Sequence, residues 1–203
     1  MFLIFACLLS FFVENQVSAL VVAPKEYYLN SSNPKKIEEF HRLFAEYGVS
    51  LKVTSIDLPE IDAEPLIVAT HKASQMLDFV LIEDTSLEIE GVSIGINLKW
   101  FFGNILQVID QYIGRKAAWR VILAYKEDHQ VYLYEGVVKG MNKQPEEGKN
   151  LDFNAYFFPE ELLDEANPEQ FNARAFAVKA LIDKKPVAVL PVITEWNGNW
   201  QKP

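Results

Sequence analysis

Residues 27–40 read YYLNSSNPKKIEEF, and this stretch determines the class of fold. Its apolar start is typical of a β-strand, and a short Ser-Ser-Asn turn follows it. Asn33 is a favoured residue at the N-cap of a helix, and Pro34 suits the first helical position. Apolar residues then recur at helical spacing. The stretch therefore predicts a strand at 26–30 that leads through a tight turn into a helix at 34–47.

Two lysines, Lys35 and Lys36, occupy the first turn of this helix. The helix dipole disfavours positive charge at that end. An anion bound at the turn would explain them, because the backbone N–H groups of a helix N-terminus bind phosphate and lysine adds charge. Ser31, Asn33 and Lys36 are therefore candidate phosphate-binding residues. The alternative is an ordinary N-cap followed by solvated lysines.

The rest of the chain alternates strands and helices before it forms a hairpin. This order predicts an α/β fold with a mixed central sheet flanked by helices. We find no internal repeat or linker, so residues 25–203 are expected to form a single domain. The expected elements are a strand at 49–56, a helix at 65–78, a strand at 79–87, a helix at 98–114, a hairpin at 117–140 turning near Asp128, and helices around 159–165 and 168–183.

Composition limits the classes of ligand. The formal net charge is −9, which disfavours a nucleic acid polymer as partner because its backbone requires a basic surface. A small anionic ligand is compatible with this charge, since a few local cations can form a positive site. The single cysteine excludes an intrachain disulfide and a CxxC cluster, and the three histidines form no metal-binding motif.

The first 24 residues are set apart by an apolar run of 12 residues at 2–13, which is too short to span a bilayer comfortably. The following VSAL could be a signal-peptidase site with cleavage at Ala19, but no basic residue precedes Lys25. Two alternatives stay open. If residues 1–19 are a signal peptide, the protein is exported. If residues 1–24 are an added apolar extension, a cytoplasmic location is expected.

Carboxylates supply the second group of candidate site residues. Glu83 and Asp84 follow four apolar residues, and we expect the strand to stop at them. Carboxylates in this position can bind Mg²⁺ or accept a proton from water. Adjacent strand residues point to opposite faces, so only one of the two should face a given site. Glu60, in the acidic loop at 57–62, is a further oxygen ligand, although acidic loops are also common on plain surfaces.

Three scattered cations complete the set of candidates. Lys72 and Lys99 fall in predicted helices, and Arg174 falls in the stretch NARAFAVKAL. Each taken alone is typical of a protein surface. Lys99 is unusual because apolar residues surround it in the sequence.

Taken in order, these stretches resemble the inosine triphosphate pyrophosphatase family, also called Ham1-like, whose members act on non-standard purine nucleotides. The resemblance covers residues 26–181. The family's Thr/Ser-x-Asn-x-x-Lys-x-x-Glu pattern appears here as Ser31, Asn33, Lys36 and Glu39. The other matches are the loop DLPE at 57–60, Lys72, the acidic EDT at 83–85, the element from Gly95 to Phe101, and the hairpin residues Tyr134, Gly136 and Gly140.

The second half of the chain departs from the family pattern. Leu151 stands where the family has an aromatic residue that stacks on the base, unless Phe153 substitutes for it. Asn154 replaces an aspartate, and Ala173 replaces a histidine next to the retained Arg174. The resemblance therefore supports the triphosphate and metal half of the site and leaves base recognition undefined.

The resemblance implies a two-lobed Ham1/Maf-like architecture with the active site in the cleft, a homodimer, and Mg²⁺ as cofactor. It implies hydrolysis of a nucleoside triphosphate to the monophosphate and pyrophosphate, on non-standard purine nucleotides or with altered base selectivity. A nucleotide-binding regulatory pseudo-enzyme on the same fold is the alternative.

Roles for individual residues follow from the same resemblance. Asp84 would orient or deprotonate the attacking water. The triphosphate would be held by Lys36, Lys72 and Lys99, Mg²⁺ by Glu60 with Glu83 or Asp84, and the base by Phe153 and Arg174. Removing Lys36 is expected to leave folding intact, because a cation at a helix N-terminus does not stabilise the helix.

Overall fold

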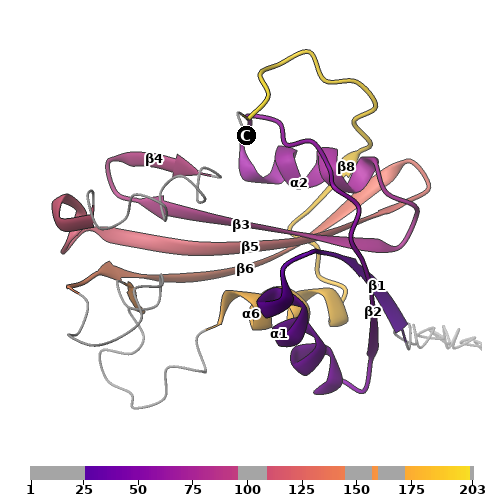
Figure 1. Cartoon of the computed structure of the whole chain (residues 1–203), viewed down its shortest axis with the longest axis horizontal. Coiled ribbons are helices and arrows are strands. Elements are labelled where there is room, and N and C mark those ends of the chain that lie inside the picture. The colour runs from indigo at the N-terminus through magenta and orange to yellow at the C-terminus, as the bar shows by residue number, and fades with distance from the viewer. Residues whose placement is uncertain (1–25, 96–108, 145–156, 160–171, 202–203) are drawn as a thin grey trace, which may run out of the picture.

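A computed structural model describes residues 26–95, 109–144, 157–159 and 172–201 (Figure 1). The expected helix at 98–114 lies largely outside the described residues, as do Lys99, Leu151, Phe153 and Asn154. The described elements are β1 (Glu26–Asn30), α1 (Pro34–Ala45), β2 (Ser50–Thr54), α2 (Pro65–Ser74), β3 (Val80–Ile89), β4 (Val92–Gly95), the short 3₁₀ helix η1 (Ile109–Tyr112), β5 (Lys116–Glu127), β6 (Gln130–Asn142), β7 (Phe157–Pro159), α6 (Ala173–Ile182) and β8 (Ala188–Pro191).

The strands form one mixed sheet in the order β2-β1-β3-β5-β6-β7, with β4 paired to β3 and β8 paired to β6. β1 runs parallel to β2 and β3, whereas all other pairs are antiparallel. The long β5–β6 hairpin turns at Asp128, as predicted. The predicted α/β fold with a mixed sheet is confirmed, while the two-lobed cleft stays a prediction.

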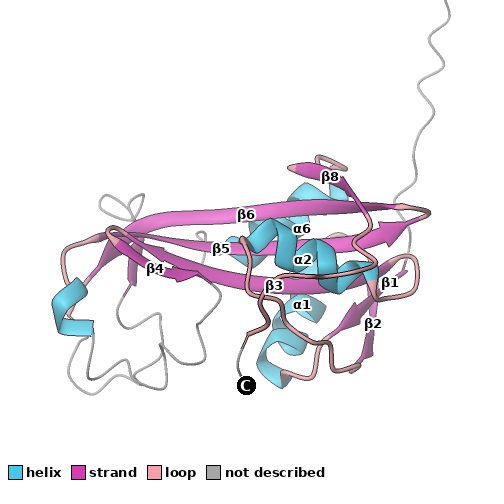
Figure 2. Ribbon diagram, turned by 90° about the horizontal axis from the view of Figure 1, so that it is seen from above, coloured by secondary structure: helices cyan, strands magenta, loops and turns pink. Residues whose placement is uncertain are grey.

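Three of the described helices cover the two faces of this sheet. α1 and α6 lie on one face, and α2 lies on the other (Figures 1 and 2). The larger core packs α1 and α6 against the sheet through Phe40, Phe44, Leu81, Leu123 and Val178. The smaller core packs α2 against the opposite face through Ala69, Ala73, Ile82, Ile122 and Leu133.

Strand β3 corrects one sequence expectation. It does not stop at Glu83 and Asp84 but continues to Ile89, because β5 pairs with it from Ile82 onwards. The two carboxylates are therefore held in mid-strand with a fixed alternation. A strand's end is set by its partner, and here the partner lies about forty residues further along the chain.

Other elements differ in length or kind from the prediction. The helix expected to reach residue 78 ends at Ser74. The helix expected around 159–165 begins in a region where 157–159 form strand β7, and 160–171 lie outside the described residues. The helix expected at 168–183 is described from Ala173. Strand β8 was not predicted from the sequence.

Two local features fix the helices next to the site. The side chain of Asn33 accepts hydrogen bonds from the N–H groups of Lys35 and Lys36, at 3.0 and 3.4 Å, so it caps α1 as predicted. Gly136 lets α6 approach β6 closely. A Cβ at that position would lie 1.9 Å from the carbonyl oxygen of Ala173, so any side chain there would push the start of α6 away.

No helix within the described residues is long and apolar enough to cross a membrane. The apolar run at 2–13 lies outside them, so the two interpretations of residues 1–24 stay predictions.

Candidate active site

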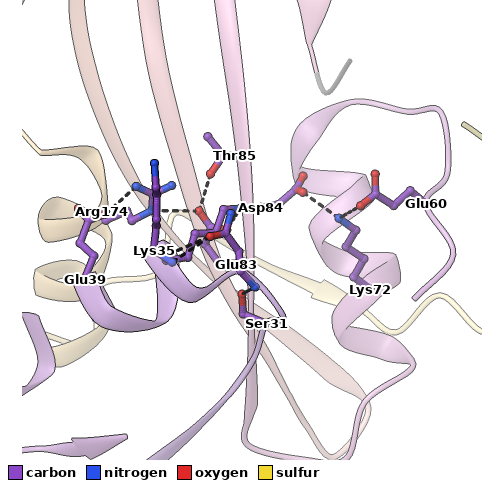
Figure 3. A network of polar contacts seen from close by, with 11 residues as sticks. Ser31, Lys35, Glu39, Glu60, Lys72, Glu83, Asp84, Thr85 and Arg174 are labelled. Carbon is purple, nitrogen blue, oxygen red and sulfur yellow. Dashed lines mark hydrogen bonds and ion pairs between the residues drawn. The ribbon is translucent and has the colours of Figure 1, made fainter. Parts of the chain in front are cut away.

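Two charged clusters lie on opposite faces of β3 and meet at its centre (Figure 3). One contains Asp84 and faces α2; the other contains Glu83 and faces α1 and α6. The sequence expectation that these neighbouring carboxylates point to opposite faces agrees with the structure.

Lys72 organises the Asp84 cluster. Its Nζ lies 2.9 Å from Asp84 Oδ1 and 2.9 Å from Glu60 Oε1, so one ammonium bridges two carboxylates. The side chains of Lys72 and Asp84 are each only 11% exposed, whereas that of Glu60 is 37% exposed. α2 supplies the lysine, β3 the aspartate, and the loop after β2 the glutamate.

Electrostatics set the proton occupancy of this cluster. Burial raises the pKa of Asp84, and the charge of Lys72 opposes this shift only in part. Burial lowers the pKa of Lys72, but the carboxylates of Asp84 and Glu60 outweigh it, so the pKa of Lys72 is raised overall. Asp84 Oδ2 is buried and has no hydrogen-bond partner within the described part of the chain. This free oxygen can accept a proton or bind a cation.

Glu83 is the centre of the second cluster and is 2% exposed. Lys36 Nζ lies 2.5 Å from its Oε2, Arg174 Nε lies 3.4 Å from its Oε1, and the hydroxyl of Thr85 donates to Oε1. Burial raises the pKa of Glu83, but Lys36 and Arg174 lower it more, so the pKa lies below its ordinary value. Glu83 is therefore an ionised carboxylate whose oxygens are already engaged.

Glu39 and Asn172 are two residues that sequence reasoning did not assign to the site. Glu39 Oε2 lies 2.8 Å from Arg174 Nη1, and Asn172 donates its side-chain amide to Glu39 Oε1 at 2.5 Å. Asn172 also caps α6 by accepting the N–H of Arg174 at 2.8 Å. The family pattern in the sequence already includes Glu39, three residues after Lys36 on one helix face, but it assigned no role to this residue. The pair attaches α6 to α1 and so positions Arg174.

The turn before α1 is closed by its own hydrogen bonds, because the side chain of Asn33 engages the N–H groups of Lys35 and Lys36. Ser31 accepts the N–H of Asn33 through its Oγ at 3.3 Å, and Lys35 is exposed. Lys36, however, extends to Glu83 on the neighbouring strand. Lys36 therefore stands in the first turn of α1 because it neutralises the buried carboxylate of Glu83. Lys35 has no such explanation.

One side of β3 lacks a described strand partner in the region of both clusters. β1 pairs with β3 only as far as the Asn30–Ile82 position, and β4 pairs with it from Leu87. Between Ile82 and Leu87, no described strand pairs with the side of β3 that faces away from β5. Ligands of open α/β sheets bind outside the carboxyl ends of strands, and β1 ends here.

The carboxylates fit a magnesium ion that is shared with a substrate. Within the described ranges, no group of three or more His, Cys, Asp or Glu side chains is placed to hold a metal by itself. Mg²⁺ is usually bound by one or two carboxylates together with water and substrate phosphates. Asp84 and Glu60 meet this requirement, since they share Lys72 and since Asp84 Oδ2 has no partner in the part of the chain that the structure describes. Glu83 fits less well, because Lys36, Arg174 and Thr85 engage its oxygens.

Replacing Lys36 by alanine should have two effects. If Lys36 also contacts a triphosphate, as the sequence pattern implies, binding of a nucleoside triphosphate should weaken by about 1–3 kcal/mol, the scale of a lost charged hydrogen bond. Unlike the expectation from the helix dipole alone, the free energy of unfolding should also fall by roughly 1–3 kcal/mol, because buried Glu83 loses its closest cation. Calorimetric titration and urea unfolding measure the two effects.

The control is Lys35→Ala, which removes the exposed neighbouring lysine. Equal losses of binding and stability in both variants would contradict a specific role for Lys36.

The fold and these clusters define an α/β protein with charged clusters on both faces of an inner strand of a mixed sheet, beside a capped helix N-terminus. The Ham1 family model matches residues 27–184, so the chain belongs to the Ham1 family.

Two relatives are known as dITP/XTP pyrophosphatases. The protein from Thermococcus kodakarensis is 28% identical over 149 residues, which cover 64% of this chain and 77% of that protein. The protein from Methanothermobacter marburgensis is 27% identical over 176 residues, which cover 73% of this chain and 90% of that protein.

Proposed function

We propose that this protein is a nucleoside triphosphate pyrophosphatase that hydrolyses non-standard purine nucleotides to the monophosphate and pyrophosphate. The observation that carries the proposal is the buried Asp84 carboxylate. Lys72 holds one of its oxygens, and the other has no partner among the described residues. Membership of the Ham1 family and the names of the two relatives support the same reaction.

The residues of the Asp84 cluster suit a water-activating role. Lys72 fixes the orientation of Asp84, and Oδ2 is left to accept a proton from water. Burial raises the pKa of Asp84 and makes it a stronger base than a solvated aspartate. When bound, Mg²⁺ would be held by Asp84 and Glu60 and would neutralise phosphate charge. Without that neutralisation, each carboxylate–phosphate pair 4 Å apart would repel by about 4 kcal/mol at an effective dielectric of 20.

The triphosphate would lie at the turn before α1. The hydroxyl of Ser31 and the exposed ammonium of Lys35 provide donors there, while the N–H groups of Lys35 and Lys36 are engaged by the Asn33 side chain. The two clusters contain more acidic than basic groups, so the cations alone do not balance a triphosphate. Binding should therefore depend strongly on Mg²⁺, in agreement with the carboxylates available at Asp84 and Glu60.

The test is a pyrophosphate-release assay with a panel of inosine, xanthosine, guanosine, adenosine and pyrimidine triphosphates, with and without Mg²⁺. Release from at least one purine triphosphate is expected, and it should require the divalent ion. Absence of release from every nucleotide, despite measurable binding, would overturn the enzymatic proposal.

A nucleotide-binding protein without turnover is the second candidate, and Ala173 is the observation that favours it. The residue stands where the family pattern has a histidine, is 1% exposed, and packs at the start of α6 against the sheet. A methyl group in the core cannot donate a hydrogen bond to a base. Binding with no pyrophosphate release would support this candidate.

Base discrimination should be weaker than the family pattern implies. Loss of a stacking partner costs about 1–3 kcal/mol per base, and loss of a hydrogen-bond donor costs a similar amount. Leu151 removes the stacking partner, and Ala173 removes the hydrogen-bond donor. The kcat/KM preference for inosine and xanthosine triphosphates over guanosine triphosphate should therefore stay below about a hundredfold. A larger preference would mean that the base contacts come from other residues. Arg174 and Phe153 are the residues that we propose retain contact with the base.

A further inference from the structure

The segment from β8 to Gln201 lies beyond the residues that match the family, which end at 184. It leaves β8, passes over α2 and returns beside the loop that precedes α2 (Figure 1). That loop carries Glu60. The segment therefore lies against an edge of the candidate site although it is not part of the family match.

Backbone hydrogen bonds join this segment to the Glu60 loop. The N–H of Gln201 donates to the carbonyl of Glu60 at 2.9 Å, and the N–H of Asp62 donates to the carbonyl of Asn199 at 2.9 Å. Between them, Ile61 and Trp200 form an antiparallel bridge. The side-chain amide of Gln201 adds a bond to the carbonyl of Ile61 at 2.9 Å. The backbone on both sides of Ile61, including the carbonyl of Glu60, is thus bonded to the C-terminal segment.

The same segment also contacts α2, which carries Lys72. The ring of His71, the residue before Lys72, meets Trp200 at 5.5 Å and Trp196 at 6.3 Å between centroids, both edge-on. The N–H of Ile193 donates to Ser74 Oγ at 2.9 Å. One segment therefore contacts the two elements whose side chains form the Glu60–Lys72 ion pair.

Glu60 needs such support because it reaches Lys72 from a loop. Asn30 holds the beginning of that loop, through hydrogen bonds with both backbone groups of Ile56 at 2.7 and 2.9 Å. The bonds to Gln201 and Asn199 hold its far end. A loop fixed at both ends keeps its carboxylate in place, and small displacements of a positioning group cost activity.

We propose that residues 196–201 are a positioning element of the site: they hold Glu60 against Lys72 and thereby support catalysis without contacting substrate. This inference rests on the proposed function for its kinetic consequence, whereas its structural consequence can be measured without any substrate.

Gln201→Pro is the variant that tests it, because proline removes the N–H that donates to Glu60, and the side-chain amide is lost with it. Gln201→Ala removes the side-chain bond alone and gives a milder, second variant. Val189→Thr in β8 is the control, since this exposed side chain lies away from the Glu60 loop.

Amide hydrogen exchange of the peptide that covers residues 60–62 is the first readout. Within this peptide, the N–H of Asp62 donates to the carbonyl of Asn199. Its exchange should quicken about tenfold or more in Gln201→Pro, less in Gln201→Ala, and not at all in Val189→Thr, because loss of the neighbouring Gln201 bond loosens this pairing. Unchanged exchange in a folded Gln201→Pro protein would overturn the proposal. If Gln201→Pro does not fold, Gln201→Ala tests the proposal instead, and unchanged exchange of residues 60–62 in that variant would overturn it.

Pyrophosphate release in two backgrounds is the second readout. Gln201→Pro should lower kcat/KM about tenfold in the full chain and have no further effect when combined with Glu60→Gln, because both changes act through one carboxylate. An equal loss in both backgrounds would overturn the positioning role. If the full chain hydrolyses no nucleotide, the proposed function fails, and exchange alone tests whether the segment holds the Glu60 loop.

Discussion

Asp84→Asn should lower turnover at least about a hundredfold, the usual scale for a positioned acid–base group. The change keeps the shape of the side chain but removes its negative charge and its capacity to accept a proton. Lys72 keeps Glu60 as a partner at 2.9 Å, so the fold should persist. Pyrophosphate release measures turnover, and calorimetric titration shows whether the nucleotide still binds.

Asp183→Asn is the matched control, because it makes the same chemical change at an exposed aspartate paired with Lys179. Normal hydrolysis is expected from it. Near-normal hydrolysis by Asp84→Asn would instead transfer the role to Glu60 or Glu83. Between these two, Glu60 would be favoured, since it shares Lys72 with Asp84 on the same face of the sheet.

Local signals in the sequence predicted the beginning of the fold well. Asn33 and Pro34 mark the start of α1, and the structure begins the helix there. This succeeds because a helix N-cap involves residues only two or three positions apart. The end of β3 could not be predicted in the same way. It depends on pairing with β5, and no local pattern around Glu83 and Asp84 reports that partner.

The charged residues of the site were also predicted better than their contacts. Lys36, Lys72, Glu60, Glu83, Asp84 and Arg174 were all named from the sequence, and the structure gathers them around the centre of β3. Their pairing required tertiary information, because Lys36 and Glu83 are 47 positions apart. Helix-dipole reasoning treated Lys36 as unsupported, whereas a buried carboxylate on the next strand supplies its partner.

The segment at 196–201 shows a further limit of pattern reasoning. Its two tryptophans and its glycine indicate no regular element, so the sequence predicted only a tail. In the structure its role comes from backbone hydrogen bonds to a loop about 140 positions earlier. Backbone hydrogen bonds of this kind can be made by almost any residue, so the sequence does not indicate them.

Glu83→Gln should lower the free energy of unfolding by about 3 kcal/mol, the lower end of the cost of removing one partner from a buried ion pair. Glutamine nearly matches the glutamate in shape, but it leaves Lys36 and Arg174 facing each other without the carboxylate between them. Arg174 keeps Glu39 at 2.8 Å and Lys36 is partly exposed, which keeps the cost from being larger. Urea unfolding at pH 7 measures the loss.

The pH dependence separates this electrostatic cause from a packing defect. The pKa of Glu83 in the folded state lies below its ordinary value of 4.5, so its stabilising contribution is complete above that value and is lost as the pH falls through the folded-state pKa. The difference between Glu83→Gln and the unsubstituted protein should therefore shrink as the pH falls below 4.5. Adding Lys36→Gln to the variant should restore part of the stability, because it removes one of the two unbalanced cations. A loss that is independent of pH and unaffected by the second substitution would show that Glu83 stabilises β3 through packing and not through its charge.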